Sequence, residues 1–118
     1  LNKKEKYLIP GPLSQIVATN VVSGQIKWKT NMPSVSYGGL ASNAGGIIVS
    51  VGTSDNLVYV LDQKTGDILW RFEMEAAGSA PPIFFTIDGK EYFSVISTGG
   101  LFKDYKEKSA TIYTFSVD

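Results

Sequence analysis

The clearest pattern of apolar and polar positions in the chain runs from residue 57 to residue 70. Residues 57–61 are all apolar, as in a strand that is buried on both faces. The next five residues form turns readily, because Asp62 accepts hydrogen bonds from the backbone that follows it and Gly66 adopts a positive φ at little cost. Apolar residues return at 68–70, Ile-Leu-Trp. This stretch therefore predicts a strand, a tight turn and a second strand that carries a tryptophan.

The same pattern also occurs earlier, between Ile16 and Trp28. The matching residues are all 42 positions apart, and they are Asn20 with Asp62, Ser23 with Thr65, Gly24 with Gly66, Ile26 with Ile68, and Trp28 with Trp70. Apolar and alternating segments predict further strands around these two stretches. The predicted strands are residues 7–9, 15–20, 25–30, 47–51, 57–62, 67–74, 83–87, 91–97 and 110–117. No segment has helical periodicity, so the sequence predicts an all-β chain.

A repeat of about 40 residues with four strands per unit is typical of a β-propeller blade. We therefore expect residues 1–118 to form a single fragment, a partial β-propeller. Its predicted parts are two outer strands of one blade (1–30), one complete four-stranded blade (38–74) and an incomplete last blade (79–118). In the last unit, the sequence of residues 92–95 is similar to that of residues 48–51. Because a closed propeller needs about four to eight blades, this chain cannot close one alone.

The composition argues against several classes of function. Eleven basic residues balance eleven acidic ones, which gives no electrostatic reason to expect nucleic acid or an anionic membrane as a partner. The chain has no cysteine and no histidine, so it lacks disulfides, thiolate metal sites and the commonest general base. The longest apolar run, residues 46–52, is too short to span a bilayer. Residues 1–6 lack the apolar stretch of a signal peptide.

Side chains that suggest chemistry also have structural interpretations. Trp28 and Trp70 suggest stacking on a sugar, but at this position of the repeat we expect them to pack between blades. Two pairs of carboxylates suggest a calcium or acid–base site, and they are Asp55 with Asp62 and Glu73 with Glu75. Because side chains alternate along a strand, the second pair lies on one face, and we expect that face to be exposed to solvent.

The repeat Leu-Asp-x-x-Thr-Gly-x-x-x-Trp, residues 61–70, resembles the tryptophan-docking motif of the eight-bladed quinoprotein dehydrogenases, which use pyrroloquinoline quinone (PQQ) and calcium. Residues 38–46, Gly-Gly-Leu-Ala-Ser-Asn-Ala-Gly-Gly, are similar to the entry into that family's penultimate blade. Residues 88–100 are similar to part of its last blade. The resemblance covers almost all of the chain from Pro12 onward. Among the branches of the family, it is most similar to the membrane-bound glucose dehydrogenases.

The resemblance implies a periplasmic parent protein that oxidises a sugar or an alcohol, with PQQ and calcium on the propeller axis. The family's calcium ligands, catalytic aspartate and basic cofactor partners lie in earlier blades. We therefore expect residues 1–118 to contain no catalytic residue and no metal ligand, to bind no cofactor, and to be inactive alone. The alternative is a non-enzymatic scaffold, since outer-membrane assembly lipoproteins carry the same tryptophan repeat. Residues 38–46 and 88–100 favour the dehydrogenases.

The resemblance also implies two stretches that would approach PQQ in an intact relative. The first stretch consists of Tyr37, Gly38, Gly39 and Leu40. Its glycines allow a close approach of the backbone to a ligand, and the structural alternative is a bend that leads into an inner strand. The second stretch consists of Gly100 and Leu101, where alcohol-oxidising relatives have a tryptophan near the cofactor. Its structural alternative is a loop with an apolar anchor.

The incomplete blades predict the partners of this fragment. The last blade lacks an outer strand and both ends of the fragment expose apolar blade faces, so that open edges and patches invite pairing. We expect the fragment to bind the rest of its propeller or to self-associate, with residues 7–9 as a candidate for an exchanged strand. Neither a nucleic-acid partner nor a membrane-spanning segment is expected.

Overall fold

The structure is a computed structural model, and it describes residues 14–33, 39–51, 55–99 and 111–118. Within these ranges the regular elements are all strands, and no helix is long and apolar enough to cross a membrane. The strands are β1 (Ser14–Thr19), β2 (Ile26–Met32), β3 (Leu40–Ser42), β4 (Ile47–Val51), β5 (Leu57–Asp62), β6 (Ile68–Glu73), β7 (Ile83–Ile87), β8 (Lys90–Ser97) and β9 (Thr111–Ser116). The predicted all-β class is therefore confirmed. The strand predicted at residues 7–9 lies outside the described residues.

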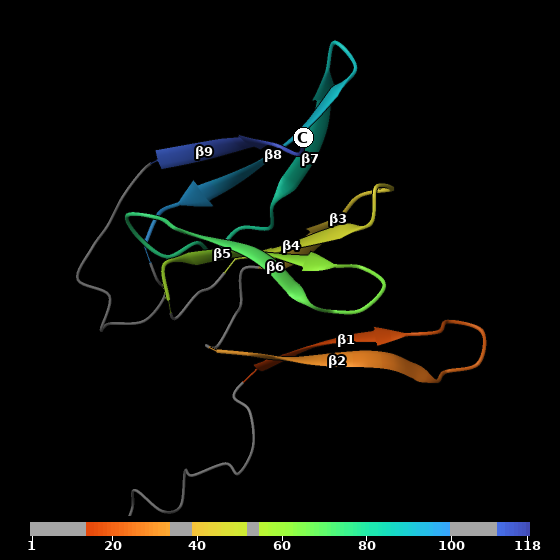
Figure 1. The fold of residues 1–118 in the computed structure, drawn as a ribbon. Helices are drawn as coiled ribbons and strands as arrows, with labels where there is room; N and C mark the ends of the chain where they lie inside the picture. The colour runs from red at the N-terminus through yellow and green to blue at the C-terminus, as the bar shows by residue number, and fades with distance from the viewer. Residues whose placement is uncertain (1–13, 34–38, 52–54, 100–110) are drawn as a thin grey trace, which may run out of the picture.

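These strands form three antiparallel sheets in which neighbours in sequence are neighbours in space. The first sheet contains β1 and β2, the middle sheet β3 to β6, and the last sheet β7 to β9. Figure 1 shows the three sheets stacked on one another, with the middle sheet between the other two. A four-stranded blade thus lies between a two-stranded and a three-stranded one. This arrangement confirms the partial propeller that the repeat predicts.

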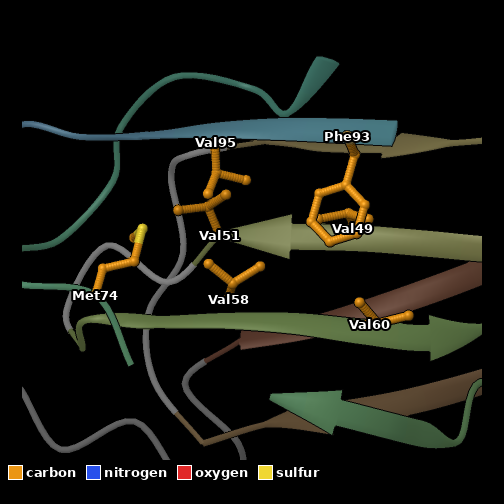
Figure 2. Close-up of a cluster of buried hydrophobic side chains, with 7 residues drawn as sticks. All are labelled: Val49, Val51, Val58, Val60, Met74, Phe93 and Val95. Atoms are coloured by element: carbon orange, nitrogen blue, oxygen red, sulfur yellow. The ribbon is translucent and has the colours of Figure 1, made fainter. Parts of the chain in front are cut away.

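The two central strands of the middle sheet are buried on both faces, because β4 and β5 turn alternate side chains toward the two neighbouring sheets. The cluster between the middle and last sheets contains Val49, Val51, Val58, Val60, Met74, Phe93 and Val95 (Figure 2). The cluster between the first and middle sheets contains Ile16, Met32, Ile48, Tyr59 and Leu61. Burial on both sides explains why residues 57–61 are apolar without interruption.

The register of the last sheet differs by one residue from the predicted one. In the middle sheet Ile48 lies opposite Leu61, and in the last sheet Phe93 lies opposite Phe115. Both Ile48 and Phe93 also face the preceding sheet. Phe93 is therefore the structural equivalent of Ile48, whereas the sequence similarity of residues 92–95 to residues 48–51 made it equivalent to Val49. The similarity was misleading because a single strand does not define its own register, which depends on pairing with the next strand.

Trp28, on β2, packs against the turn between β5 and β6 of the middle sheet. Its Nε1 donates a hydrogen bond to the carbonyl of Gln63 at 3.0 Å, and Thr30 Oγ1 donates one to the carbonyl of Gly66 at 2.6 Å. Gly66 has a φ of 78°, and a Cβ added there would lie 2.4 Å from the indole ring. Trp28 thus packs between two blades, as expected, and the turn beneath it requires glycine for its conformation and for space.

The two turns of the repeat contain the same hydrogen bonds. In each turn a side-chain oxygen accepts from the amides two and three residues later: Asp62 Oδ1 from Lys64 (2.7 Å) and Thr65 (3.0 Å), Asn20 Oδ1 from Val22 (2.9 Å) and Ser23 (3.0 Å). In each turn the glycine amide donates to the carbonyl of the first residue at 2.8 Å. Residues that match in sequence therefore build matching turns.

Candidate functional site

The described candidate residues lie at one end of the stacked sheets. Because paired strands are antiparallel, β3, β5, β7 and β9 begin at the end where β2, β4, β6 and β8 finish. Gly39 precedes β3 and Gly99 follows β8, so both belong to this end, which we call the Gly39 end. The opposite end carries the tight turns at residues 62–67 and 88–89. The structure thus brings Gly39, Leu40 and the residue before Gly100 to a common end.

Gly39 lies at the entry to β3, beside the segment that leads into β7. It has a φ of 73°, and a Cβ added there would lie 3.3 Å from Pro81 Cγ. A side chain at position 39 would therefore be strained and would press on Pro81. Leu40 opens β3 opposite Ser50, and half of its surface is exposed. Tyr37 and Gly38 lie outside the described residues.

The second candidate stretch, Gly100 and Leu101, also lies outside the described residues. The residue before it, Gly99, has a φ of 102°. The amides of Thr98 and Gly99 both donate to the carbonyl of Ala77, at 3.1 and 2.9 Å. The chain is therefore anchored to the connection between the middle and last sheets directly before the predicted stretch.

The contact between this connection, residues 76–78, and the buried Ser97 was not predicted from the sequence. Ser97 Oγ donates to the carbonyl of Ala76 at 2.8 Å and accepts from the amide of Ala76 at 3.0 Å. Gly78 lies directly against Val51, since a Cβ added to it would be 2.2 Å from Val51 Cγ1. The sequence signal was the run Ala-Ala-Gly-Ser-Ala at residues 76–80, because small residues allow such close backbone approach.

Asp55 is occupied by local hydrogen bonds at the Gly39 end. Its Oδ2 accepts from the Tyr59 hydroxyl at 2.6 Å, and its Oδ1 accepts from the amide of Leu57 at 3.0 Å. Burial, and then the hydrogen bond to Asp55, raise the pKa of Tyr59 above its usual value. Asp62 lies at the other end of β5. The carboxylate pair of Asp55 and Asp62 suggested by the sequence is therefore wrong, because a strand of this length separates the two side chains.

The second carboxylate pair, Glu73 with Glu75, is exposed to solvent, as expected. Glu75 also helps to join the middle and last sheets. Its carboxylate accepts a hydrogen bond from Thr111 Oγ1 at 3.3 Å, and its amide donates to the Tyr113 hydroxyl at 3.3 Å. These contacts give Glu75 a structural role between two blades.

The described residues do not by themselves fit a metal ion or an anionic cofactor. Within the described ranges, no group of three His, Cys, Asp or Glu side chains is arranged to hold a metal. The described cations lie within β2 and β6 or at the opposite end, and they are Lys27, Lys29, Lys64, Arg71 and Lys90. At the Gly39 end the chain offers an exposed backbone at Gly39 and an apolar side chain at Leu40. A ligand bound there would need further partners from outside the described residues.

The chain matches a known protein family over residues 1–93, described as PQQ glucose/ethanol/alcohol dehydrogenase, β-propeller domain. It is similar to methanol dehydrogenase (cytochrome c) subunit 1 of Paracoccus denitrificans, with 30% identity over 97 residues, covering 75% of this chain and 15% of that protein. It is also similar to the quinoprotein glucose dehydrogenase of Escherichia coli, with 36% identity over 70 residues, covering 59% of this chain and 9% of that protein.

The similarity extends to solved structures. The quinohemoprotein alcohol dehydrogenase from Comamonas testosteroni has the same fold over 86% of this chain and 16% of its own, with a TM-score of 0.72 and 23% identity. The chain thus spans less than a fifth of the length of each of these relatives. Because methanol and glucose dehydrogenases both match, the glucose branch is not confirmed. The chain belongs to the β-propeller family of the PQQ-dependent glucose, ethanol and alcohol dehydrogenases.

Proposed function

We propose that residues 1–118 form the last blades of a PQQ-dependent dehydrogenase that oxidises an alcohol or a sugar, and that they do not catalyse this reaction alone. The family match over residues 1–93 is the observation that carries the proposal. The same match favours the dehydrogenase over a scaffold of the outer-membrane assembly type. The described residues contribute the stacked blades and the Gly39 end, and the proposal assigns the catalytic residues to other blades.

In this proposal the Gly39 end faces the cofactor. When bound, PQQ supplies the acceptor for the two electrons that leave the substrate, and calcium supplies a Lewis acid. Gly39 and Leu40 provide a close backbone approach and an apolar contact, and the remaining expected contacts are Tyr37, Gly38, Gly100 and Leu101. No described carboxylate or cation is assigned to the cofactor or the metal. The parent protein would work in the periplasm, as the resemblance implies.

Two measurements test the proposal. The protein encoded by the complete gene is reconstituted with PQQ and calcium, and dye-linked oxidation of primary alcohols and of glucose is followed. We expect oxidation that depends strictly on added PQQ. If neither class of substrate is oxidised in a PQQ-dependent way, the proposal is overturned. In parallel, calorimetry of the 118-residue chain with PQQ and calcium is expected to give no binding heat. Saturable binding there would contradict the claim that this fragment lacks a complete site.

The Gly39 end can be tested in the same reconstituted protein. Gly39→Ala introduces a side chain beside Pro81 at a φ of 73°, whereas Gly89→Ala has a similar φ of 79° with nothing within 4 Å, at the opposite end. Both substitutions strain the backbone by about 1 kcal/mol. We expect only Gly39→Ala to weaken PQQ binding, measured by titration of the apoprotein. Equal PQQ affinities in the two variants would contradict the proposal that the Gly39 end lies beside the cofactor.

A further inference from the structure

The connection between the middle and last sheets, residues 76–78, is held by one buried side chain of β8. Ser97 is fully buried, and its hydroxyl donates to the carbonyl of Ala76 at 2.8 Å and accepts from the amide of the same residue at 3.0 Å. A hydroxyl is the smallest side-chain group that can both donate and accept. Because Ala76 is buried as well, alanine at position 97 would remove the partner of two backbone groups that have no water nearby.

The same connection also holds the chain where it leaves β8. The amides of Thr98 and Gly99 both donate to the carbonyl of Ala77, at 3.1 and 2.9 Å. Gly78 comes next and lies against β4, since a Cβ added to it would be 2.2 Å from Val51 Cγ1. The connection is therefore bound to the end of β8 on one side and packed on β4 on the other, which leaves it no room to shift.

After the connection the chain passes the first candidate stretch. Pro81 and Pro82 lead into β7, and Pro81 Cγ lies 3.3 Å from the position that a Cβ would take at Gly39. Proline has a fixed φ and restricts the residue before it to extended conformations, so residues 80–82 form a stiff segment. A displacement of residues 76–78 would therefore be passed on, across only two residues, to the proline that contacts Gly39.

We propose that Ser97 is a positioning residue for the Gly39 end. Through Ala76 and the connection that follows, Ser97 fixes the entry to β3 relative to the exit from β8, so that Gly39 and Gly99 move as one unit. The proposal rests on the proposed function, in which this end faces the cofactor. Ser97 is fully buried and touches no ligand itself. It acts on binding through the backbone geometry of the two glycines, which it keeps preorganised.

Amide signals in NMR spectra of the 118-residue chain test this coupling without any cofactor. Ser97→Ala removes both hydrogen bonds to the connection. The control Ser94→Ala, also on β8, removes the 2.7 Å hydrogen bond to Thr114 within the last sheet. We expect Ser97→Ala to shift the amide signal of Gly39 and to speed hydrogen exchange at Gly99 at least roughly tenfold, and Ser94→Ala to do neither. An unchanged Gly39 signal in folded Ser97→Ala would overturn the proposal.

Two further variants keep the test decisive and trace its path. Ser97→Cys serves if alanine prevents folding, because the slightly larger thiol fills the site but forms only weak hydrogen bonds. We expect it to move the Gly39 signal in the same direction by less, and no movement would overturn the proposal. Pro81→Ala, at an exposed position, should uncouple the two stretches, so that a second substitution at Ser97 still speeds exchange at Gly99 but no longer moves Gly39. Equal movement of Gly39 with and without Pro81 would contradict coupling through the connection.

PQQ titration of the complete apoprotein links the coupling to the cofactor. We expect Ser97→Ala to weaken PQQ binding at least roughly tenfold, because the two stretches are no longer held in the binding geometry, and Ser94→Ala to leave it unchanged. Equal PQQ affinities of the two variants would contradict the role of Ser97 at this end. A wild-type protein that binds no PQQ would overturn the proposed function instead, and the amide signals, which are measured without PQQ, would still decide the coupling.

Discussion

At the scale of single residues, the blades are joined at points where a side chain is missing or small. Gly66 lies under the ring of Trp28, and Gly78 lies against Val51. Ser97 forms two hydrogen bonds with the backbone of Ala76, and it is fully buried. Because protein interiors are densely packed, the missing atoms at the two glycines are what allow neighbouring sheets to approach. Substitutions at these points should therefore weaken blade stacking more than substitutions elsewhere in the turns.

The repeat offers a matched pair of glycines for a stability test. Gly24 and Gly66 have nearly the same φ, 74° and 78°, but only at Gly66 would an added Cβ meet other atoms, those of the Trp28 indole and Thr30 Oγ1. Alanine at either position strains the backbone by about 1 kcal/mol. At position 66 the overlap with Trp28 adds about 1–3 kcal/mol. We expect Gly66→Ala to lower the free energy of unfolding more than Gly24→Ala, measured with urea, and equal losses would show that the docked indole moves freely.

The buried phenol of Tyr59 should make the stability depend on alkaline pH. Its folded-state pKa is raised above the unfolded value near 10.0 by burial and by the hydrogen bond to Asp55. The neutral phenol thus contributes stability that is complete below about pH 10 and is lost as the pH rises further. We expect the free energy of unfolding to fall more steeply between about pH 10 and 12 in the wild type than in Tyr59→Phe. Parallel pH profiles would contradict a buried neutral Tyr59.

At the scale of elements, the strands differ in how many neighbours hold them. β4 and β5 pair on both edges and are covered on both faces, whereas β1 and β2 form a sheet of two strands that is covered on one face. A two-stranded sheet is marginal by itself, because few backbone groups and little apolar surface are buried. The stability of this fragment should therefore be concentrated in the middle sheet.

Hydrogen exchange followed by NMR checks this distribution. We expect the amides of β4 and β5 to exchange only through opening of the whole fragment, and those in the β1–β2 ladder to exchange through local opening at lower free energy. The amides of Ile16 and Val60, both in buried positions of their strands, provide a direct comparison. Equal protection of the two ladders would show that the first sheet is not held more weakly than the middle one.

At the scale of the whole molecule, the stack of blades leaves the outer face of the last sheet uncovered by any described element. Ile83, Ile87 and Ile112 are exposed on this face, and Phe85 and Tyr92 stack there at 5.7 Å between ring centroids. The face of the last sheet that covers the middle one is apolar too. A blade of this kind is built to be covered on both sides, and an exposed apolar sheet face favours association.

We therefore expect the isolated fragment to self-associate. Sedimentation should show a mass that rises with protein concentration, and Ile83→Lys together with Ile87→Lys should shift the population toward monomer, because charges on both copies repel and are costly to bury. Val17→Lys, at an exposed position of the first sheet, is the control and should change the mass less. A wild-type chain that stays monomeric at high concentration would contradict this expectation.

Much of the fold was predictable because the repeat is encoded locally. Asp62 and Gly66 define their turn by hydrogen bonds and backbone conformation that involve only their own neighbours. The continuous apolar run of β5 indicates that this strand is buried on both faces. The candidate site was less predictable. Gly39 was found as a glycine with a special conformation, but its contact with Pro81 was not. The role of Ser97 was missed as well, since its partner is far away in sequence.

The sequence by itself determined most of the strands, though not β3, together with the turns, the blade period and the family, because these depend on patterns within about 40 residues of chain and on motifs that recur. Tertiary structure alone decided the register of Phe93 against Phe115 and the apolar cavity that Trp70 lines between the middle and last sheets. The physical reason is the same in each case. Pairing and packing join residues from different strands and sheets, so their geometry depends on several segments at once and is not contained in any one of them.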